Sequence, residues 1–118
     1  MDLEGLRRYC LSLPHATEDV KWGDNLLFRV GKKMFAITPL DRTPTTVCFK
    51  CTPEEFAELL EHEGIIPAPY LARNKWVLVE RLDVLPAKEL KRLIRDSYKM
   101  VAAGLPKKVR DQLQINVI

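Results

Sequence analysis

Apolar residues concentrate in two short runs in the first half of the chain, at positions 26–30 and 34–37. Aromatic and β-branched side chains favour strands, and Gly31 between the runs can adopt the positive φ that a tight hairpin requires. Phe28 and Val30 would point to the same face of the first strand, because side chains alternate along a strand. The pattern therefore predicts a β-hairpin at the centre of a sheet.

Local signals for helix starts and ends predict four helices outside the hairpin. A first helix would begin after Asp2, which can cap it, and end at Pro14. The segment 52–55, Thr-Pro-Glu-Glu, is a capping box with proline at the first helical position, and it predicts a middle helix. Proline also opens a last long helix over 86–103, and a short terminal helix is expected over 106–113.

The other apolar or alternating stretches predict strands at 20–22, 46–50 and 75–80. The polar segment 15–19 has the composition of a turn, and 39–45 that of a loop. The resulting order is one helix, three or four strands, a helix, one or two strands and a final helix. Because strands and helices are segregated, the sequence predicts a two-layer α+β domain with helices packed on an antiparallel sheet.

Length and composition fit this prediction. A chain of 118 residues with 47% hydrophobic and 30% charged residues is typical of one globular domain, here residues 1–118. No apolar run approaches the roughly 20 residues that span a bilayer, and the N-terminus does not resemble a signal peptide. Three cysteines, an odd number, favour a reducing compartment, so we expect a cytoplasmic protein without membrane contact.

The net charge of +3 is unevenly distributed. Residues 1–85 carry eleven Lys and Arg against thirteen Asp and Glu, whereas residues 86–118 carry eight against three. At 100° per residue the last long helix has one apolar stripe and an opposite basic stripe. The basic stripe and the lysines that follow it are candidate phosphate contacts: Lys88, Lys91, Arg92, Arg95, Lys99, Lys107 and Lys108. A solvated helix face would give the same pattern.

A second candidate patch combines cations with an aromatic residue, a combination that suits backbone contact and base stacking. Its members lie on the central hairpin and at or just before the start of the last strand: Arg29, Lys32, Lys33, Arg73, Lys75 and Trp76. Core positions are the alternative for Trp22 and Trp76. Sequence alone does not show whether the two basic patches share a surface.

Cys48 and Cys51 have the C-x-x-C spacing of redox and zinc sites. Residues three apart in a strand point to opposite faces, which opposes a disulfide between them. Zinc would need two more ligands, for which only His15 and His62 are available. We therefore expect reduced, structural cysteines and no metal or cofactor.

Enzymatic chemistry has little support in the sequence. There is no glycine-rich phosphate loop, nucleophile elbow or recognisable carboxylate pair. Ser97 lies on the apolar stripe of the last long helix, where we expect its hydroxyl to bond back to the carbonyl of Leu93. We expect a protein without catalytic activity.

An ordered set of landmarks resembles the MmcQ/YjbR family of small bacterial proteins. They run from about residue 10 to residue 108: Leu13-Pro14, Glu18-Asp19, Trp22-Gly23, Phe28-x-Val30-Gly31-Lys32-Lys33-Met34-Phe35, Lys50-Cys51-Thr52-Pro53-Glu54, Pro67-x-x-Tyr70, Asn74-Lys75-Trp76, Ser97-Tyr98 and Leu105-Pro106-Lys107. The resemblance implies a two-layer α+β fold shared with bacterial secretion chaperones, and DNA binding through a "double wing" of hairpins. The family's histidines near the lysine-tryptophan segment are missing here, between residues 71 and 76.

These observations lead to one functional hypothesis and two alternatives. The first is a small cytoplasmic protein that binds DNA through phosphates, with little sequence preference. The second is a protein-interaction module that holds a partner chain on a chaperone-like sheet or an exposed hairpin edge. The third is a small-molecule or redox role. An exposed cationic surface would favour the first, and an exposed apolar patch or open strand edge the second.

Overall fold

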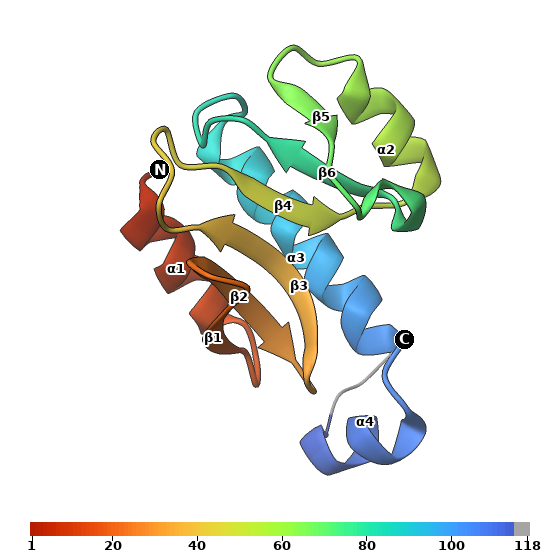
Figure 1. Ribbon diagram of the computed structural model, residues 1–118. Helices are drawn as coiled ribbons and strands as arrows, with labels where there is room; N and C mark the ends of the chain where they lie inside the picture. The colour runs from red at the N-terminus through yellow and green to blue at the C-terminus, as the bar shows by residue number, and fades with distance from the viewer. Residues whose placement is uncertain (115–118) are drawn as a thin grey trace.

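The computed structural model describes residues 1–114 and has an α+β architecture, as the sequence predicted (Figure 1). Its elements in chain order are α1 (Leu3–Ser12), β1 (Thr17–Lys21), β2 (Asn25–Val30), β3 (Lys33–Pro39), β4 (Val47–Lys50), α2 (Pro53–Leu60), β5 (Ile65–Pro67), the 3₁₀ turn η1 (Ala72–Asn74), β6 (Trp76–Val79), α3 (Ala87–Ala103) and α4 (Lys107–Leu113). No helix within the described range is long and apolar enough to cross a membrane.

The six strands form one antiparallel sheet in the order β1-β2-β3-β4-β6-β5. The predicted central hairpin is confirmed: Val30 pairs with Lys33 across a two-residue turn. Both turn residues, Gly31 and Lys32, have positive φ, 55° and 73°, which matches the twist of a hairpin. The first strand starts earlier than predicted, because pairing with β2 makes Thr17 and its neighbours extended despite their polar composition.

Helix starts follow the local signals. The Asp2 carboxylate accepts a hydrogen bond from the Gly5 amide at 2.8 Å, and the Thr52 hydroxyl accepts one from the Glu55 amide at 3.1 Å. Each cap satisfies one of the amides that a helix leaves without an internal partner. These two contacts fix where α1 and α2 begin.

The helices α1, α2 and α3 pack on one face of the sheet and build the main core. Fully buried side chains from the sheet meet α3 there, among them Phe28, Phe35 and Phe49. The opposite face carries a smaller cluster, which is covered by the connection between β5 and β6: Cys48, Ala68, Trp76 and Leu78, with Leu71 packed against them. The molecule therefore has two layers, with helices on one side only.

Two contacts hold α1 alongside α3. The Tyr98 hydroxyl of α3 donates a hydrogen bond of 2.6 Å to the carbonyl of Pro14, just after α1. Seven residues before Tyr98 on α3, the Lys91 ammonium lies 5.6 Å from the ring centroid of Tyr9. Because Tyr9 precedes Pro14 and Lys91 precedes Tyr98, the two helices run side by side in the same direction.

The hydrogen bonds of Ser97 differ from the predicted one. Its hydroxyl donates to the carbonyl of Phe35 at 2.7 Å and accepts from the amide of Lys50 at 2.9 Å, so it does not bond back to Leu93. Pairing of β3 with β4 ends at Ala36 and Phe49. The buried hydroxyl thus bridges the next residue pair, where the two strands no longer bond each other.

Candidate functional site

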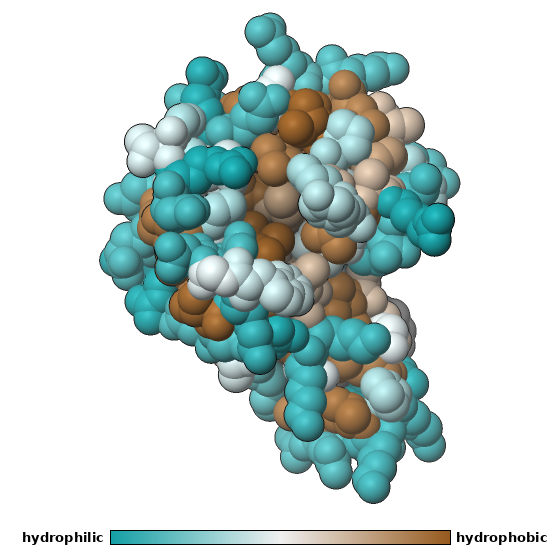
Figure 2. Space-filling model, viewed as in Figure 1, coloured by the Kyte–Doolittle hydropathy of each residue, from teal (hydrophilic) through white to brown (hydrophobic). Residues whose placement is uncertain are grey.

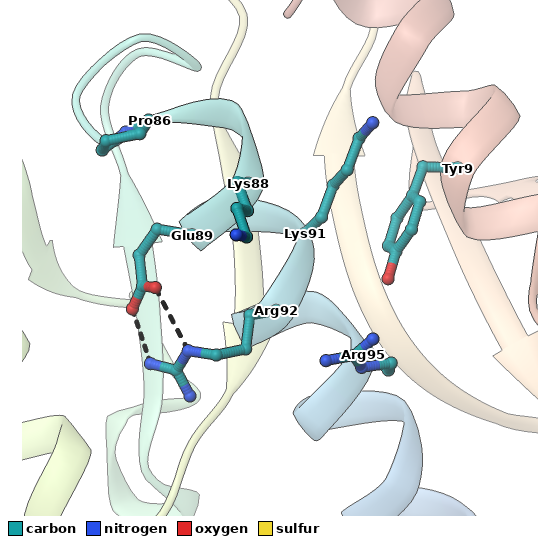
Figure 3. Close-up of a pocket in the computed structure, with 7 residues that line it drawn as sticks. All are labelled: Tyr9, Pro86, Lys88, Glu89, Lys91, Arg92 and Arg95. Carbon is teal, nitrogen blue, oxygen red and sulfur yellow. Dashed lines mark hydrogen bonds and ion pairs between the residues drawn. The ribbon is translucent and has the colours of Figure 1, made fainter.

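A groove between α1 and α3 carries most of the exposed cations on the helical side of the molecule (Figure 3). One part, with a volume of about 440 Å³, is lined by Tyr9, Pro86, Lys88, Glu89, Lys91, Arg92 and Arg95. An adjoining hollow of about 430 Å³ shares Tyr9 and Lys91, and adds Arg8 and the N-terminal turn of α1. We call this surface, with Arg8, Tyr9, Lys88, Lys91 and Arg95, the α1–α3 groove.

The amphipathic pattern of α3 places these side chains. Its buried positions face the sheet: Leu90, Leu93, Ile94, Ser97, Tyr98 and Ala102. Lys88 and Arg95 lie two turns apart on the opposite side, since seven residues correspond to about two turns of helix. Lys91 is displaced toward α1, where it reaches Tyr9 (Figure 3). The predicted apolar stripe is therefore confirmed, and Lys88, Lys91 and Arg95 of the predicted basic stripe are exposed outside it.

Tyr9 forms the wall of the groove on the α1 side. Its ring is half-buried, and burial raises the pKa of its hydroxyl, although the nearby charge of Arg95 opposes that shift. The hydroxyl is therefore protonated at neutral pH and can donate a hydrogen bond to an anion. Neither Tyr9 nor Arg8 was a sequence candidate, because their role depends on the docking of α1 against α3.

Arg92 does not belong to the open cationic surface, contrary to the sequence prediction. Its guanidinium bonds Glu89 at 2.5 Å, Asp96 at 2.9 Å and, across to α2, Glu55 at 3.2 Å. The hydrogen bonds to Glu89 and Glu55 raise the pKa of Arg92, and the bond from Arg92 lowers the pKa of Glu89. A charge with three carboxylate partners has little capacity left for a phosphate.

The same network distinguishes paired from unpaired charges on α3. Glu55, Glu89 and Asp96 all pair with Arg92, and Lys50 and Lys99 line a hollow with Glu55 and Asp96, so the charges toward α2 are mixed and largely paired. On the α1 side, the cations of the groove form no ion pair with any of the residues from 1 to 114. The side of α3 toward α2 thus holds paired charges of both signs, whereas the exposed cations toward α1 have no ion-pair partner within residues 1–114.

The second predicted patch does not form as proposed. Trp76 is only 5% exposed and packs in the smaller cluster, so its ring cannot stack on a base. The Lys75 ammonium lies 5.1 Å from the ring centroid of Phe56. Arg29 bonds Asp19 at 2.9 Å and the carbonyl of Lys32 at 2.8 Å, which leaves it half-buried and paired.

The tryptophans divide between surface and core. Trp76 follows the alternative interpretation, as a core residue. Trp22 does not: it is 67% exposed in the turn between β1 and β2, where its φ of 51° belongs to the left-handed region. The turn geometry directs this large side chain away from both layers.

The remaining cations lie outside the groove. Lys99 is exposed one helical turn beyond Arg95 and lines a separate hollow with Lys50 and Asp96. Arg73 is exposed on η1. The other exposed lysines among the predicted contacts lie at the turn between β2 and β3 and at the start of α4: Lys32, Lys33, Lys107 and Lys108.

The three cysteines are buried in the hydrophobic clusters of the protein. Cys48 and Cys51 lie in different clusters on opposite faces of the sheet, as the strand argument predicted, and all three cysteines are buried and free. Burial raises the thiol pKa of Cys10 to about 12, and that of Cys48 and Cys51 to about 11. Residues 1–114 contain no group of three or more His, Cys, Asp or Glu side chains that could hold a metal ion.

Comparisons with known proteins show the family to which the chain belongs. It is similar to a crystal structure of the Deinococcus radiodurans protein DR2400, assigned to domain DUF419, with 32% identity and a TM-score of 0.88 over 98% of this chain and 90% of the other. A Pseudomonas syringae protein of known structure shares 25% identity, with a TM-score of 0.71 over 86% of this chain and 99% of the other. None of the curated proteins matches the sequence. The YjbR family model matches residues 11–100, which is most of the chain, and the protein therefore belongs to the YjbR family.

Proposed function

We propose that the protein binds DNA through the phosphate backbone, with the α1–α3 groove as the principal contact. The observation that supports this is the contrast on α3 between the paired charges around Arg92 and the unpaired cations of the groove. Arg92 holds three carboxylates on the α2 side, while Arg8, Lys88, Lys91 and Arg95 remain exposed and without ion pairs inside the described range. Four such cations, with a protonated Tyr9 hydroxyl beside them, suit a polyanion better than an acidic or neutral ligand.

Helix orientation adds to the attraction. The hollow next to the groove is lined by Met1, Gly5 and Ala87, so α1 and α3 begin at the same end of it. The N-terminus of a helix carries a partial positive charge of about half a unit, which favours nearby anions. The Asp2 carboxylate already caps α1, so this contribution comes from the start of α3, which has no side-chain cap.

The proposed binding has little sequence preference. The groove presents ammonium and guanidinium groups on the outside of α3, and the helix is held flat against the sheet by its buried stripe. Contacts of this kind fix position on the backbone but do not read base edges. Affinity should therefore depend strongly on salt and weakly on sequence.

A salt series of binding measurements on duplexes of random sequence tests the proposal. The variant Lys88→Gln, Lys91→Gln, Arg95→Gln should lower the magnitude of the log K against log salt slope by about 0.9 for each lost contact. A matched control, Lys21→Gln, Arg42→Gln, Arg81→Gln, removes the same charge from exposed positions elsewhere. Absence of wild-type binding at low salt, or equal losses in both variants, would refute the proposal.

The alternative, a protein-interaction module, rests on the free edge at β1. Within the described residues β1 pairs only with β2, and Val20 and Trp22 beside this edge are 53% and 67% exposed. The helix-free face of the sheet also shows a broken band of apolar side chains, framed by hydrophilic ones (Figure 2). A partner strand could add to such an edge, and Trp22→Ser would then weaken partner capture without changing DNA binding.

A further inference from the structure

The turn between β2 and β3 is anchored on the segment that joins α3 to α4. A Cβ atom placed on Gly31 would lie 2.7 Å from Cδ1 of Leu105 and 3.1 Å from Cγ1 of Val109. Leu105 is only 3% exposed, so this contact is a closed apolar joint. Two segments more than seventy residues apart in the sequence are therefore held together at the end of α3.

Four lysines lie next to this joint in the sequence. Lys32 and Lys33 follow Gly31 in the hairpin, and Lys107 and Lys108 form the first turn of α4, ahead of Val109. All four are exposed and have no ion pair within residues 1–114. The acidic side chain on α4 is Asp111, one helical turn after Lys107 and Lys108, so the balance around the joint stays strongly positive. We call these four lysines the joint cluster.

The joint cluster and the α1–α3 groove lie toward opposite ends of α3 (Figure 1). At 1.5 Å per residue, the helix advances roughly 22 Å from Lys88 to Ala103. The exposed Lys99 lies between them on the same helix. A duplex aligned with α3 rises about 3.4 Å per base pair, so this distance corresponds to about seven base pairs.

We propose that the joint cluster is a second phosphate-contact site, and that one duplex lying along α3 engages it together with the α1–α3 groove. The inference rests on the proposed function, and it specifies the partner as a double-stranded, rod-like polyanion. A duplex that crossed α3 would reach the groove alone. Half of the joint cluster, on α4, lies beyond the part of the chain that the family model matches, so the second site does not follow from family membership.

Duplex length is the variable that tests this arrangement. We would measure the affinity for duplexes of about 6, 10 and 16 base pairs. The separation of the two sites predicts a gain in affinity once the duplex is longer than about seven base pairs. The joint variant is Lys32→Asn, Lys33→Gln, Lys107→Gln, Lys108→Gln. Asparagine is chosen at position 32 because it tolerates the positive φ found there. Lys21→Gln, Arg42→Gln, Arg73→Gln, Arg81→Gln is the control of equal charge.

The affinity of the wild type should rise with duplex length by more than the added number of binding positions on the duplex explains. The joint variant should lose this additional gain. Its salt slope on the longest duplex should fall by about 0.9 per lost contact, whereas the control should not change. A joint variant that keeps the wild-type slope and length dependence would overturn the second site while leaving the groove proposal intact. If the wild type binds no duplex, the proposed function fails and this inference with it. Thermal melts of all variants would establish that they are folded.

Discussion

Replacing Ser97 with alanine removes a hydroxyl that joins three elements of the fold. The side chain is fully buried on α3, donates to the carbonyl of Phe35 on β3 and accepts from the amide of Lys50 on β4. Alanine cannot reproduce either bond, and the two strands do not bond each other at this pair. The variant therefore leaves a carbonyl and an amide without partners inside the protein.

The expected loss follows from these two groups. An unsatisfied buried donor or acceptor costs about 1–3 kcal/mol, and the lower end applies to the Lys50 amide because it is only partly buried. The free energy of unfolding should thus fall by about 2–4 kcal/mol. Equilibrium unfolding in urea measures this difference directly from the transition midpoint and slope.

Ser12→Ala is the matched control. The Ser12 hydroxyl also donates to a carbonyl, that of Tyr9, but it lies at an exposed helix end where water replaces the lost group. Its effect should stay within about 0.5 kcal/mol. If Ser97→Ala unfolds within the same margin as this control, the hydroxyl does not bridge β3 and β4 as described.

Two further predictions use the same reasoning from burial and backbone geometry. Gly31→Ala should lower the free energy of unfolding by at least about 1 kcal/mol more than Gly23→Ala. Both positions have positive φ, but only at Gly31 does the added methyl group meet Leu105 and Val109. Equal urea midpoints for the two variants would contradict this prediction. The three thiols should react slowly with a disulfide reagent at pH 8 in the native protein and rapidly in the unfolded protein. Burial raises the pKa of each thiol to about 11 or above, which keeps the thiols protonated. Rapid stoichiometric labelling of the native protein would refute this prediction.

The parts of the fold that sequence predicts are those with local causes. Asp2 and Thr52 start helices through side-chain bonds to amides three residues ahead, and Gly31 turns a hairpin by its own φ. Ser97 was wrongly predicted because its partners lie 62 and 47 residues away, on strands whose packing against α3 no local rule specifies. The start of β1 was also misjudged, since pairing with β2 overrode its polar composition.

The candidate site was only partly predictable for the same reason. The basic stripe on α3 follows from helical spacing, and Lys88, Lys91 and Arg95 were identified in this way. Arg8 enters the site only because α1 docks beside α3. Trp76 was excluded from the second patch by the cluster of side chains around it. Both outcomes depend on contacts between elements that sequence periodicity does not encode.

Arg92 shows why charge counted along a helix can mislead. In sequence it is one more cation in a basic stripe, whereas in the structure it ties α2 to α3 and holds Glu55, Glu89 and Asp96 around itself. Those carboxylates pair with Arg92, and Lys88, Lys91 and Arg95 form no ion pair within residues 1–114. A charge-reversing change at Arg92 would therefore free carboxylates rather than remove a phosphate contact. The surface that α3 offers to an anion is set by which of its neighbours carry acids, and that is a property of the packed structure.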